Sequence, residues 1–393
     1  MTLLFSIAGF VLIAATVPLV CELLLLTAAS LLPETKPRIA GANTISSLAV
    51  VIPAHNEEGT IRACVESLLL SATAEVSVYV VAHNCTDTTA ALGEAAGATA
   101  LIYNDASARG KGHALRHGFS YAVAHGAEAV LVVDADSTVS PNLISEVLYA
   151  LRHGASAVQC RYDLYPGKAR VRSELVALAL RAFNLVRPLG RSRLGLSAGI
   201  LGNGFALSSS TLCAVPYSAF SLVEDLEYHL NLVLADKKVA FIPAAIVSSE
   251  LPTAKNGETA QHARWQGGRL QAAKTWLPRL TRELMKGRLS ILEPVLDLIS
   301  LPVALGMAAI LLTLAIPLAF TRIYAVIALA AVLAYVLRAI SLGSNRLRAM
   351  ALLAQAPLYM IWKLFLIPKV LYASTARAIW VRTERNSTAK GTL

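Results

Sequence analysis

Hydrophobic and polar positions divide the chain into three regions, and the first is a membrane anchor. Residues 1–32 form an apolar run that only Glu22 breaks, and it is long enough to cross a bilayer. It begins without the positive charge that a cleaved signal peptide carries. Lys36 and Arg38 follow it, which places that end in the cytoplasm. We therefore expect a permanent transmembrane helix and, over 33–45, a juxtamembrane linker.

The second region, 46–263, alternates short apolar runs with helical patterns. The runs 47–54, 76–83 and 127–134 have the length and β-branched content of buried strands, and a helical pattern follows each. Strands separated by helices predict an α/β domain with a mainly parallel sheet covered on both faces. Ligands of such sheets bind beyond the carboxyl ends of the strands.

The third region returns to apolar sequence. In 264–290, seven basic residues and one acid interleave with apolar residues, which predicts an amphipathic segment on the membrane surface; the alternative is a solvated charged helix. Within 291–341 we expect two transmembrane helices, Leu298–Phe320 and Ile323–Ser341, with Arg322 in the turn between them.

A third apolar stretch, Met350–Ala373, lies within 342–385, where we expect a cytoplasmic loop to precede it. The stretch is long enough to cross but contains two prolines and two lysines. Crossing would place the basic residues after it outside the cytoplasm, against the positive-inside bias. We expect an interfacial or re-entrant segment, with a spanning helix as the alternative, and a flexible tail over 386–393.

Composition agrees with a membrane protein and argues against nucleic-acid binding. Hydrophobic residues make up 55% of the chain, charged residues 15%, and the mean hydropathy is +0.57. The net charge is +10, but much of the basic charge lies beside apolar runs, where anionic lipid is the natural partner. Five cysteines without a C-x-x-C pair indicate neither a zinc site nor a disulfide framework.

Two carboxylates close the third strand-like run. Asp134 and Asp136 are two residues apart, so on a strand they would point to the same side. Such a pair suits Mg²⁺ or Mn²⁺ shared with phosphate oxygens. The alternative is that Asp136 or Ser137 caps the helix expected near Pro141.

Polar residues also follow the first two runs. Pro53, His55 and Glu57 lie at the end of the first, and His83 and Asn84 at the end of the second. We expect them to line one sheet edge together with the aspartate pair. The alternative is capping of the next helix.

The segment Arg109–Gly112 adds a loop suited to phosphates. Its glycines let the backbone approach a ligand, and Arg109 and Lys111 match the charge of a diphosphate. The alternative is a basic helix start on the surface. The segment lacks the full spacing of a Walker loop.

Six motifs occur in order between Leu48 and Trp265: VVIPAHNEE, RGKGHAL, VVDAD, GNGFAL, LVEDLEYHL and QHARW. Together they resemble the family 2 glycosyltransferases of the GT-A fold. The last, Q-x-x-R-W, resembles the membrane-embedded branch, which includes cellulose, hyaluronan, chitin-oligosaccharide and poly-N-acetylglucosamine synthases and ceramide glucosyltransferase. The resemblance implies an integral inner-membrane protein of bacterial type, with a cytoplasmic GT-A domain, two or three C-terminal transmembrane helices and basic interfacial helices.

The resemblance implies inverting transfer from a nucleoside-diphosphate sugar, expected to be a UDP-sugar, with Mg²⁺ or Mn²⁺. The acceptor would be a growing polysaccharide or a lipid-linked molecule, and export or accessory subunits are further partners. A non-catalytic, membrane-bound sugar-nucleotide sensor is the alternative class. It would predict loss of Asp225 or Asp136, and both are present.

The resemblance also assigns roles to single residues. Asp225 matches the catalytic base. Its neighbour Glu224 either shares the catalytic site or forms a capping box with Ser221. Arg264 would hold the leaving diphosphate, and the resemblance makes it a catalytic residue together with Asp225 and Glu224. Asp134 would face the ribose and phosphates, and Asp134 and Asp136 the metal.

The remaining assignments concern the two substrates. The implied donor site consists of Pro53, His55, Glu57, His83, Asn84, Lys111, Asp134, Gln261, Arg264 and Trp265. The implied acceptor site consists of Gly202, Asn203, Gly204, Asp225 and Trp265. Trp265 has interfacial anchoring as its alternative role. His83 stands where many family members carry an aspartate that reads uracil, and a neutral imidazole still accepts a hydrogen bond from a ring N–H.

Overall fold

The computed structural model describes residues 1–33, 45–72, 76–167, 170–251 and 255–375. It divides into two compact units: a sheet unit of 35–167 and 197–258, and a helical unit of 1–34, 168–196 and 259–378. The expected linker, apart from its first and last residues, and the expected tail lie outside the described residues. Each unit is described by itself.

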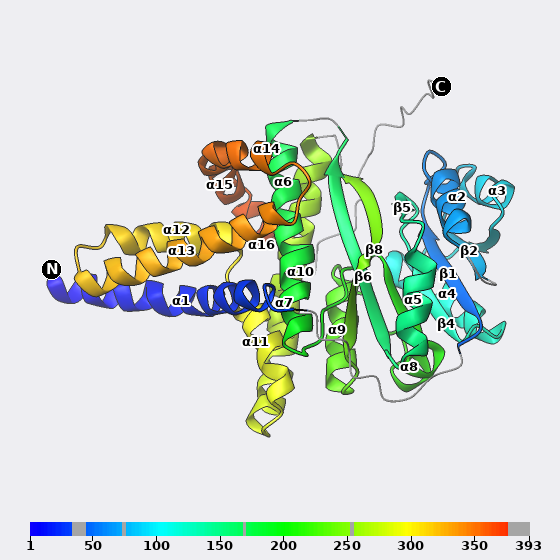
Figure 1. Cartoon of the computed structure of the whole chain (residues 1–393), viewed down its shortest axis with the longest axis horizontal. Coiled ribbons are helices and arrows are strands. Elements are labelled where there is room, and N and C mark those ends of the chain that lie inside the picture. Colours follow the sequence, from blue (N-terminus) through cyan, green and yellow to red (C-terminus); the bar gives the residue numbers. More distant parts are fainter. Residues whose placement is uncertain (34–44, 73–75, 168–169, 252–254, 376–393) are drawn as a thin grey trace. The chain divides into compact units, whose positions relative to one another are not determined.

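The sheet unit contains one sheet of eight strands in the order β3-β2-β1-β4-β7-β6-β8-β5 (Figure 1). The strands are β1 (Leu48–Ala54), β2 (Val76–His83), β3 (Thr99–Tyr103), β4 (Ala129–Val132), β5 (Ser137–Val139), β6 (Ala157–Pro166), β7 (Phe205–Ser208) and β8 (Val239–Leu251). The three strands expected from the sequence are confirmed as β1, β2 and β4, and they pair in parallel. The pairs β2–β3 and β6–β8 are parallel too, whereas β7 is antiparallel to both β4 and β6, and β5 is antiparallel to β8. The sheet is therefore mixed, with four parallel and three antiparallel strand pairs among the described residues.

Helices cover both faces of this sheet because its central strands are apolar on both sides. Alternate residues of β1 belong to two separate cores, Val50 and Ile52 to one and Ala49 and Val51 to the other. The first core includes α2 (Ile61–Ser71) and α5 (Leu143–Arg152). The second includes α4 (Lys111–Ala124), α8 (Ser209–Ala214) and α9 (Glu224–Leu234). The short α3 (Thr89–Ala95) follows β2.

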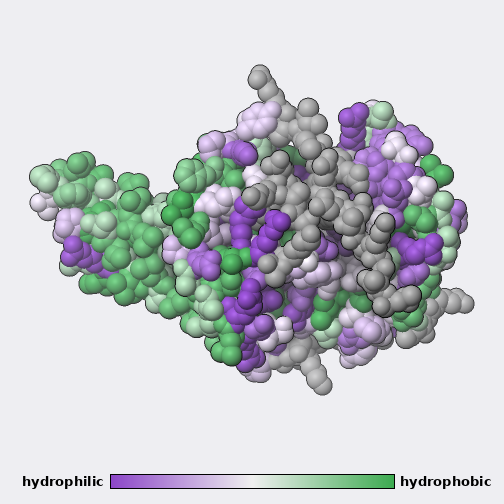
Figure 2. Space-filling view, turned by 90° about the horizontal axis from the view of Figure 1, so that it is seen from above, coloured by the Kyte–Doolittle hydropathy of each residue, from purple (hydrophilic) through white to green (hydrophobic). Residues whose placement is uncertain are grey.

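In the helical unit, α1 (Thr2–Ala29), α12 (Val303–Ala315) and α13 (Ala319–Ser341) lie side by side (Figure 1). Their outer surface is mostly hydrophobic (Figure 2). Among the described residues, α1 and α13 are each long and apolar enough to cross a membrane. The expected helices at 1–32 and Ile323–Ser341 therefore exist, and their composition is compatible with membrane insertion.

The expected single helix Leu298–Phe320 is wrong. The chain instead forms α11 (Leu292–Ile299) and α12, which meet at a 75° bend. Pro302 explains the break, because a proline lacks the backbone N–H and disfavours helical geometry in the residue before it. Arg322 lies inside α13, and residues 316–318 form the turn.

The other helices of this unit are α6 (Val171–Arg181), α7 (Arg187–Arg193), α10 (Lys255–Met285), α14 (Arg346–Leu352), α15 (Ala356–Phe365) and α16 (Ile367–Ala373). A π-helical turn, 182–186, joins α6 to α7. The helix expected for the basic segment 264–290 is confirmed by α10, which begins earlier. The apolar stretch Met350–Ala373 is divided, with a 44° bend before α16. Residues 170–196, expected in the catalytic domain, pack in the helical unit.

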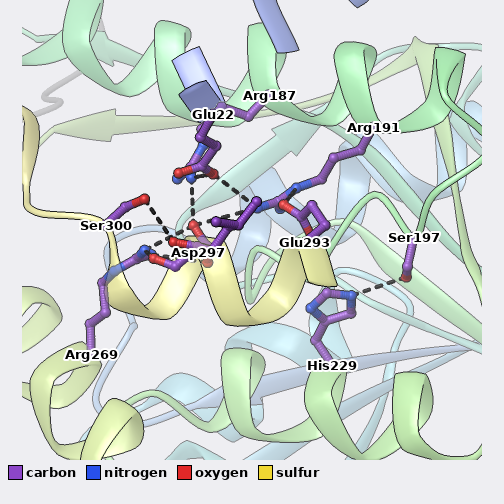
Figure 3. Close-up of polar contacts among 10 residues, drawn as sticks. Glu22, Arg187, Arg191, Ser197, His229, Arg269, Glu293, Asp297 and Ser300 are labelled. Carbon is purple, nitrogen blue, oxygen red and sulfur yellow. Dashed lines mark hydrogen bonds and ion pairs between the residues drawn. The ribbon is translucent and has the colours of Figure 1, made fainter. Parts of the chain in front are cut away.

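A buried cluster of ion pairs joins four of these helices (Figure 3). It contains Glu22 of α1, Arg187 and Arg191 of α7, Arg269 of α10, and Glu293 and Asp297 of α11. Asp297 Oδ1 lies 2.5 Å from Arg187 and 2.8 Å from Arg269, and Glu22 pairs with Arg187. Three carboxylates balance three guanidinium groups, so the single charge of the first apolar run is neutralised inside the unit.

Replacing Asp297 should destabilise the helical unit strongly. Asp297→Asn leaves the buried Arg187 and Arg191 and the partly buried Arg269 with two carboxylates. An uncompensated buried charge costs about 3–5 kcal/mol of unfolding free energy. Thermal melting of the purified full chain should show a clear drop in Tm. The matched control is Glu66→Gln, which breaks the half-exposed pair Arg62–Glu66 and should change Tm little. Equal Tm values for the two variants would contradict the role of the cluster.

Candidate active site

The aspartate pair lies in a turn after β4. Strand β4 ends at Val132, and the Ser137 N–H donates to the Asp134 carbonyl at 3.0 Å, which closes the turn. Ala135 is buried whereas Asp134 and Asp136 are partly exposed, so both carboxylates lie on the open side. The capping alternative is wrong, because β5 intervenes and α5 begins later, at Leu143, without a side-chain cap.

Lys111 lies between this turn and the glycine-rich loop Gly202–Gly204. It is the first residue of α4, and its Nζ contacts the Asp134 carboxylate and the Gly202 carbonyl, the latter at 2.6 Å. A side chain at Gly112 would lie 2.2 Å from the Ala219 carbonyl oxygen, so only glycine permits this approach of α4. Burial opposes the charge on Lys111, but Asp134, Glu224 and Asp225 together raise its pKa.

The loop Gly202–Gly204 supports the aspartate turn. The Asn203 side chain is 1% exposed; its Oδ1 accepts the Asp134 N–H at 3.0 Å and its Nδ2 donates to Ser137 Oγ at 2.8 Å. Asn203 therefore positions the turn, rather than facing an acceptor as the sequence suggested. Gly202 and Gly204 both have positive φ, of 79° and 68°, which favours glycine.

Two polar residues of β6, the buried Gln159 and the partly buried Tyr162, also lie beside this loop, and sequence reasoning missed both. Gln159 Oε1 accepts the Leu201 N–H at 2.9 Å, and its Nε2 donates to the Asn203 carbonyl at 2.8 Å. Burial, with a further contribution from Asp134, raises the pKa of Tyr162 to about 12, so its hydroxyl keeps its proton beside the site. The available signal was a lone glutamine inside an apolar strand, since buried polar groups require partners.

Asp225 lies next to the same loop. Its Oδ1 accepts the Leu226 N–H at 2.8 Å, and its Oδ2 is 3.2 Å from the point where a Cβ on Gly202 would stand. Burial, with a smaller contribution from Asp134, raises the pKa of Asp225, while the Leu226 N–H and the Lys111 charge oppose the rise. The carboxylate therefore holds a proton at higher pH than an ordinary aspartate does.

The capping-box alternative for Glu224 is wrong. Glu224 is the first residue of α9, and no side-chain cap precedes it at Val223. The Ser221 N–H donates to the Glu227 carboxylate at 3.1 Å. Glu224 acts instead on Lys111, whose pKa it raises.

The ends of β1 and β2 meet at one edge, as the sequence predicted. His55 Nδ1 lies 2.8 Å from the His83 carbonyl oxygen, and the Glu57 N–H donates to Thr89 Oγ1 at 2.8 Å. The Thr86 N–H donates to Asn56 Oδ1 at 2.7 Å. These bonds hold the two loops together beside the aspartate turn, because β1 also pairs with β4.

His83 is buried at this edge and contacts neighbouring side chains, which the sequence did not predict. Its side chain is 5% exposed, and its ring stacks on that of Tyr103 with centroids 4.9 Å apart. Burial lowers its pKa, so the ring is neutral. Its Nε2 lies 3.1 Å from Asn84 Nδ2, which assigns Nε2 as an acceptor within the protein. Asn84 also bonds the backbone of Asp105.

Gln261, Arg264 and Trp265 lie in the helical unit. All three are on α10, so their expected helical spacing of i, i+3 and i+4 is confirmed. Pro53 is the sixth residue of β1, where it pairs with Val81 of β2.

The described residues contain no group of three or more His, Cys, Asp or Glu side chains able to hold a metal ion by themselves. Asp134 and Asp136 are a fitting pair for Mg²⁺ or Mn²⁺, because such ions take one or two carboxylates together with phosphate and water. Three carboxylates, Asp134, Glu224 and Asp225, act on the single ammonium of Lys111. This excess of negative charge suits an additional cation.

The structure resembles those of solved glycosyltransferases. A mannosyltransferase from Pyrobaculum calidifontis, solved with GDP-mannose and Mn²⁺, matches with TM-score 0.55 and 19% identity over 96% of this chain and 99% of that chain. A glucosyl-3-phosphoglycerate synthase from Mycobacterium tuberculosis, solved with Mn²⁺, UDP and phosphoglyceric acid, matches with TM-score 0.39 and 23% identity over 56% of this chain and 77% of that chain. The first likeness supports a GT-A-like fold.

A search of curated proteins finds no match. The family model described as glycosyltransferase like family 2 matches residues 46–268, which is more than half of the chain. The match includes the aspartate turn, the glycine-rich loop and Asp225. The chain therefore belongs to the glycosyltransferase-like family 2.

Proposed function

We propose that the protein is a membrane-bound, inverting glycosyltransferase of the Q-x-x-R-W branch. It moves a sugar from a nucleoside-diphosphate sugar, expected to be a UDP-sugar, to a growing polysaccharide or a lipid-linked acceptor. The observation that carries the proposal is the position of Asp225, a carboxylate of raised pKa that lies beside Gly202. The Gly202 carbonyl accepts a hydrogen bond from Lys111, and Lys111 pairs with Asp134.

The donor side consists of Lys111 and the aspartate turn. Asp134 and Asp136 would hold Mg²⁺ or Mn²⁺, which neutralises charge on the departing diphosphate. Lys111 adds a fixed positive charge, held in place by Asp134 and Gly202. Preorganised charges of this kind stabilise a transition state because they need not reorient during the reaction.

The acceptor side consists of Asp225. Its carboxylate accepts the proton of the acceptor hydroxyl while that oxygen bonds to the anomeric carbon and the bond from this carbon to the phosphate oxygen breaks. One base and one displacement invert the configuration, and no covalent glycosyl-enzyme forms. The raised pKa makes Asp225 a better proton acceptor than an ordinary aspartate.

Arg264 and Trp265 of α10 are proposed to hold the leaving diphosphate and a sugar ring, as the family branch implies. The base of the donor is proposed to be uracil. Since His83 Nε2 is bonded to Asn84, the base would be recognised largely by backbone groups at the β1 and β2 ends. The proposed membrane location is supported by α1 and α13, which are long and apolar enough to span a bilayer.

Removing the base should abolish turnover and leave donor binding. Asp225→Asn keeps the size of the side chain but loses the proton acceptor, so kcat should fall by about 10²-fold or more. Isothermal titration should still show Mn²⁺-dependent binding of UDP, and tighter binding of UDP than of GDP. Glu227→Gln, two residues further along α9 at a carboxylate that accepts the Ser221 N–H, is the matched control and should retain turnover. Wild-type-like turnover of Asp225→Asn would refute the assignment.

The acid limb of the pH profile should depend on Lys111. The positive charge of Lys111 lowers the pKa of Asp225, and Asp225 works only when deprotonated. Lys111→Gln should therefore raise that pKa and move the acid limb of kcat/KM to higher pH. Arg109→Gln, which removes an exposed cation two residues away, should leave the limb in place. An unmoved limb in Lys111→Gln would contradict the coupling.

A methyl group at Gly202 should act on catalysis through Asp225. Gly202→Ala adds a Cβ 3.2 Å from Asp225 Oδ2 at a φ of 79°. Gly126→Ala is the matched control, because it imposes a similar φ of 82° with nothing within 4 Å. Both variants should lose a similar amount of Tm from backbone strain of about 1–2 kcal/mol. Only Gly202→Ala should lower kcat at saturating donor, and equal kcat values would argue against the contact.

A further inference from the structure

A buried pair of serine hydroxyls joins the strand after the aspartate turn to β8. Ser137, the residue after Asp136, lies opposite Ser249 where β5 pairs with β8. Their Oγ atoms are 2.7 Å apart, and each side chain is 1% exposed. The neighbours of Ser249 on the buried face of β8 are Val247 and Leu251. A hydroxyl buried beside apolar residues costs free energy unless it is hydrogen-bonded, so its bonds indicate its role.

The Ser137 hydroxyl connects this pair to the proposed metal ligand. It donates to Asp136 Oδ1 at 3.2 Å, and Asn203 Nδ2 donates to Ser137 Oγ at 2.8 Å. A hydroxyl has one proton to donate, and an ionised carboxylate only accepts. A hydrogen bond to a carboxylate is stronger than one to another hydroxyl. The Ser137 proton is therefore assigned to Asp136 and not to Ser249.

That assignment sets the direction of the next two bonds. Ser249 donates to Ser137, because Ser137 has used its own proton. The Tyr162 hydroxyl of β6 bonds the side chains of Ser249 and Asn203. Because Asn203 Oδ1 already accepts a backbone N–H of the aspartate turn, its Nδ2 donates to Tyr162, and Tyr162 donates to Ser249. Each hydroxyl thus donates once, in the order Tyr162, Ser249, Ser137, and the last bond ends on Asp136.

We infer that Ser249 is a positioning residue for Asp136 in metal binding, and that Tyr162 supports it. The inference rests on the proposed function, in which Asp136 holds Mg²⁺ or Mn²⁺. Ser249 acts through Ser137 and contacts neither metal nor substrate itself. Partners that hydrogen-bond a metal ligand fix its orientation, and a chain of hydrogen bonds strengthens its members. A donor two bonds away therefore still acts on the carboxylate.

The position of β5 explains why the turn needs this bond. β5 has three residues and is the last strand of the sheet, so its backbone pairs on one side only, with β8. Asp136 directly precedes it and is partly exposed. The Ser137–Ser249 bond adds a side-chain link to this short pairing, at the residue next to the carboxylate. Strand β8 thereby limits the movement of Asp136.

Manganese binding tests this role independently of sugar transfer. Electron paramagnetic resonance of the purified full chain, titrated with Mn²⁺ alone, measures free Mn²⁺ and gives its Kd. Ser249→Ala should raise this Kd about tenfold, as loss of a ligand's partner does. Ser248→Ala, one residue earlier on the other face of β8, is the matched control and should keep the wild-type Kd. An unchanged Kd in Ser249→Ala would overturn the inference.

Asp136→Asn distinguishes failure of this inference from failure of the proposed function. It removes the carboxylate itself and should weaken Mn²⁺ binding more than Ser249→Ala does. Wild-type Mn²⁺ binding in Asp136→Asn, or an absence of Mn²⁺ binding in the unchanged protein, would refute the metal site and the inference with it. Weak binding in Asp136→Asn with wild-type binding in Ser249→Ala would refute the positioning role alone.

Tyr162→Phe tests the chain of hydroxyls with little change in packing, because the ring remains. Removal of the more distant hydroxyl should raise the Kd for Mn²⁺ about threefold. If the hydroxyls act through one chain, the double variant Tyr162→Phe, Ser249→Ala should bind Mn²⁺ as Ser249→Ala does. A purely structural role would lower Tm and leave the Kd unchanged. Single effects that multiply in the double variant would contradict a single chain.

Discussion

The contact of Lys111 with the Asp134 carboxylate and the Gly202 carbonyl is the constraint on which the rest of the active site depends. It joins three segments that are far apart in the chain: the start of α4, the turn after β4 and the loop before β7. An ammonium group withdrawn from water remains charged only where carboxylates surround it, so its position is set by Asp134, Glu224 and Asp225 together. Moving any one of the three segments would break at least one of these two contacts.

Two charge clusters among the described residues illustrate two uses of charge withdrawn from water. In the helical unit, three carboxylates and three arginines balance one another, and the cluster joins four helices. In the sheet unit, three carboxylates act on one lysine, so the negative charge is in excess. A balanced cluster stabilises packing, whereas an excess of one sign at a partly exposed edge favours binding of an ion of the other sign.

The sequence predicted those strands whose local pattern of apolar residues is distinctive. Strands β1, β2 and β4 are uniformly apolar because both of their faces are covered, and that signal is strong in one sequence. Strands β6 and β8 were missed because their residues mix buried and partly exposed positions, and β7 was missed because it has only four residues. Sequence motifs identified Asn203 as important, but its partners Asp134 and Ser137 are more than sixty residues away, so its positioning role required the structure. Pro302 was a local signal for a helix break, but the length of the apolar run led to the prediction of one continuous helix.

The interleaving of the two units explains why the chain cannot be cut simply into a catalytic domain and an anchor. Residues 170–196 lie between β6 and β7 in the sequence but pack in the helical unit. They bring Arg187 and Arg191 into contact with Glu22, Glu293 and Asp297. A chain ending before α11 would keep both arginines and lose two of their three carboxylates. Because an unbalanced buried charge is costly, the inserted segment that carries both arginines depends on the apolar helices for its charge balance.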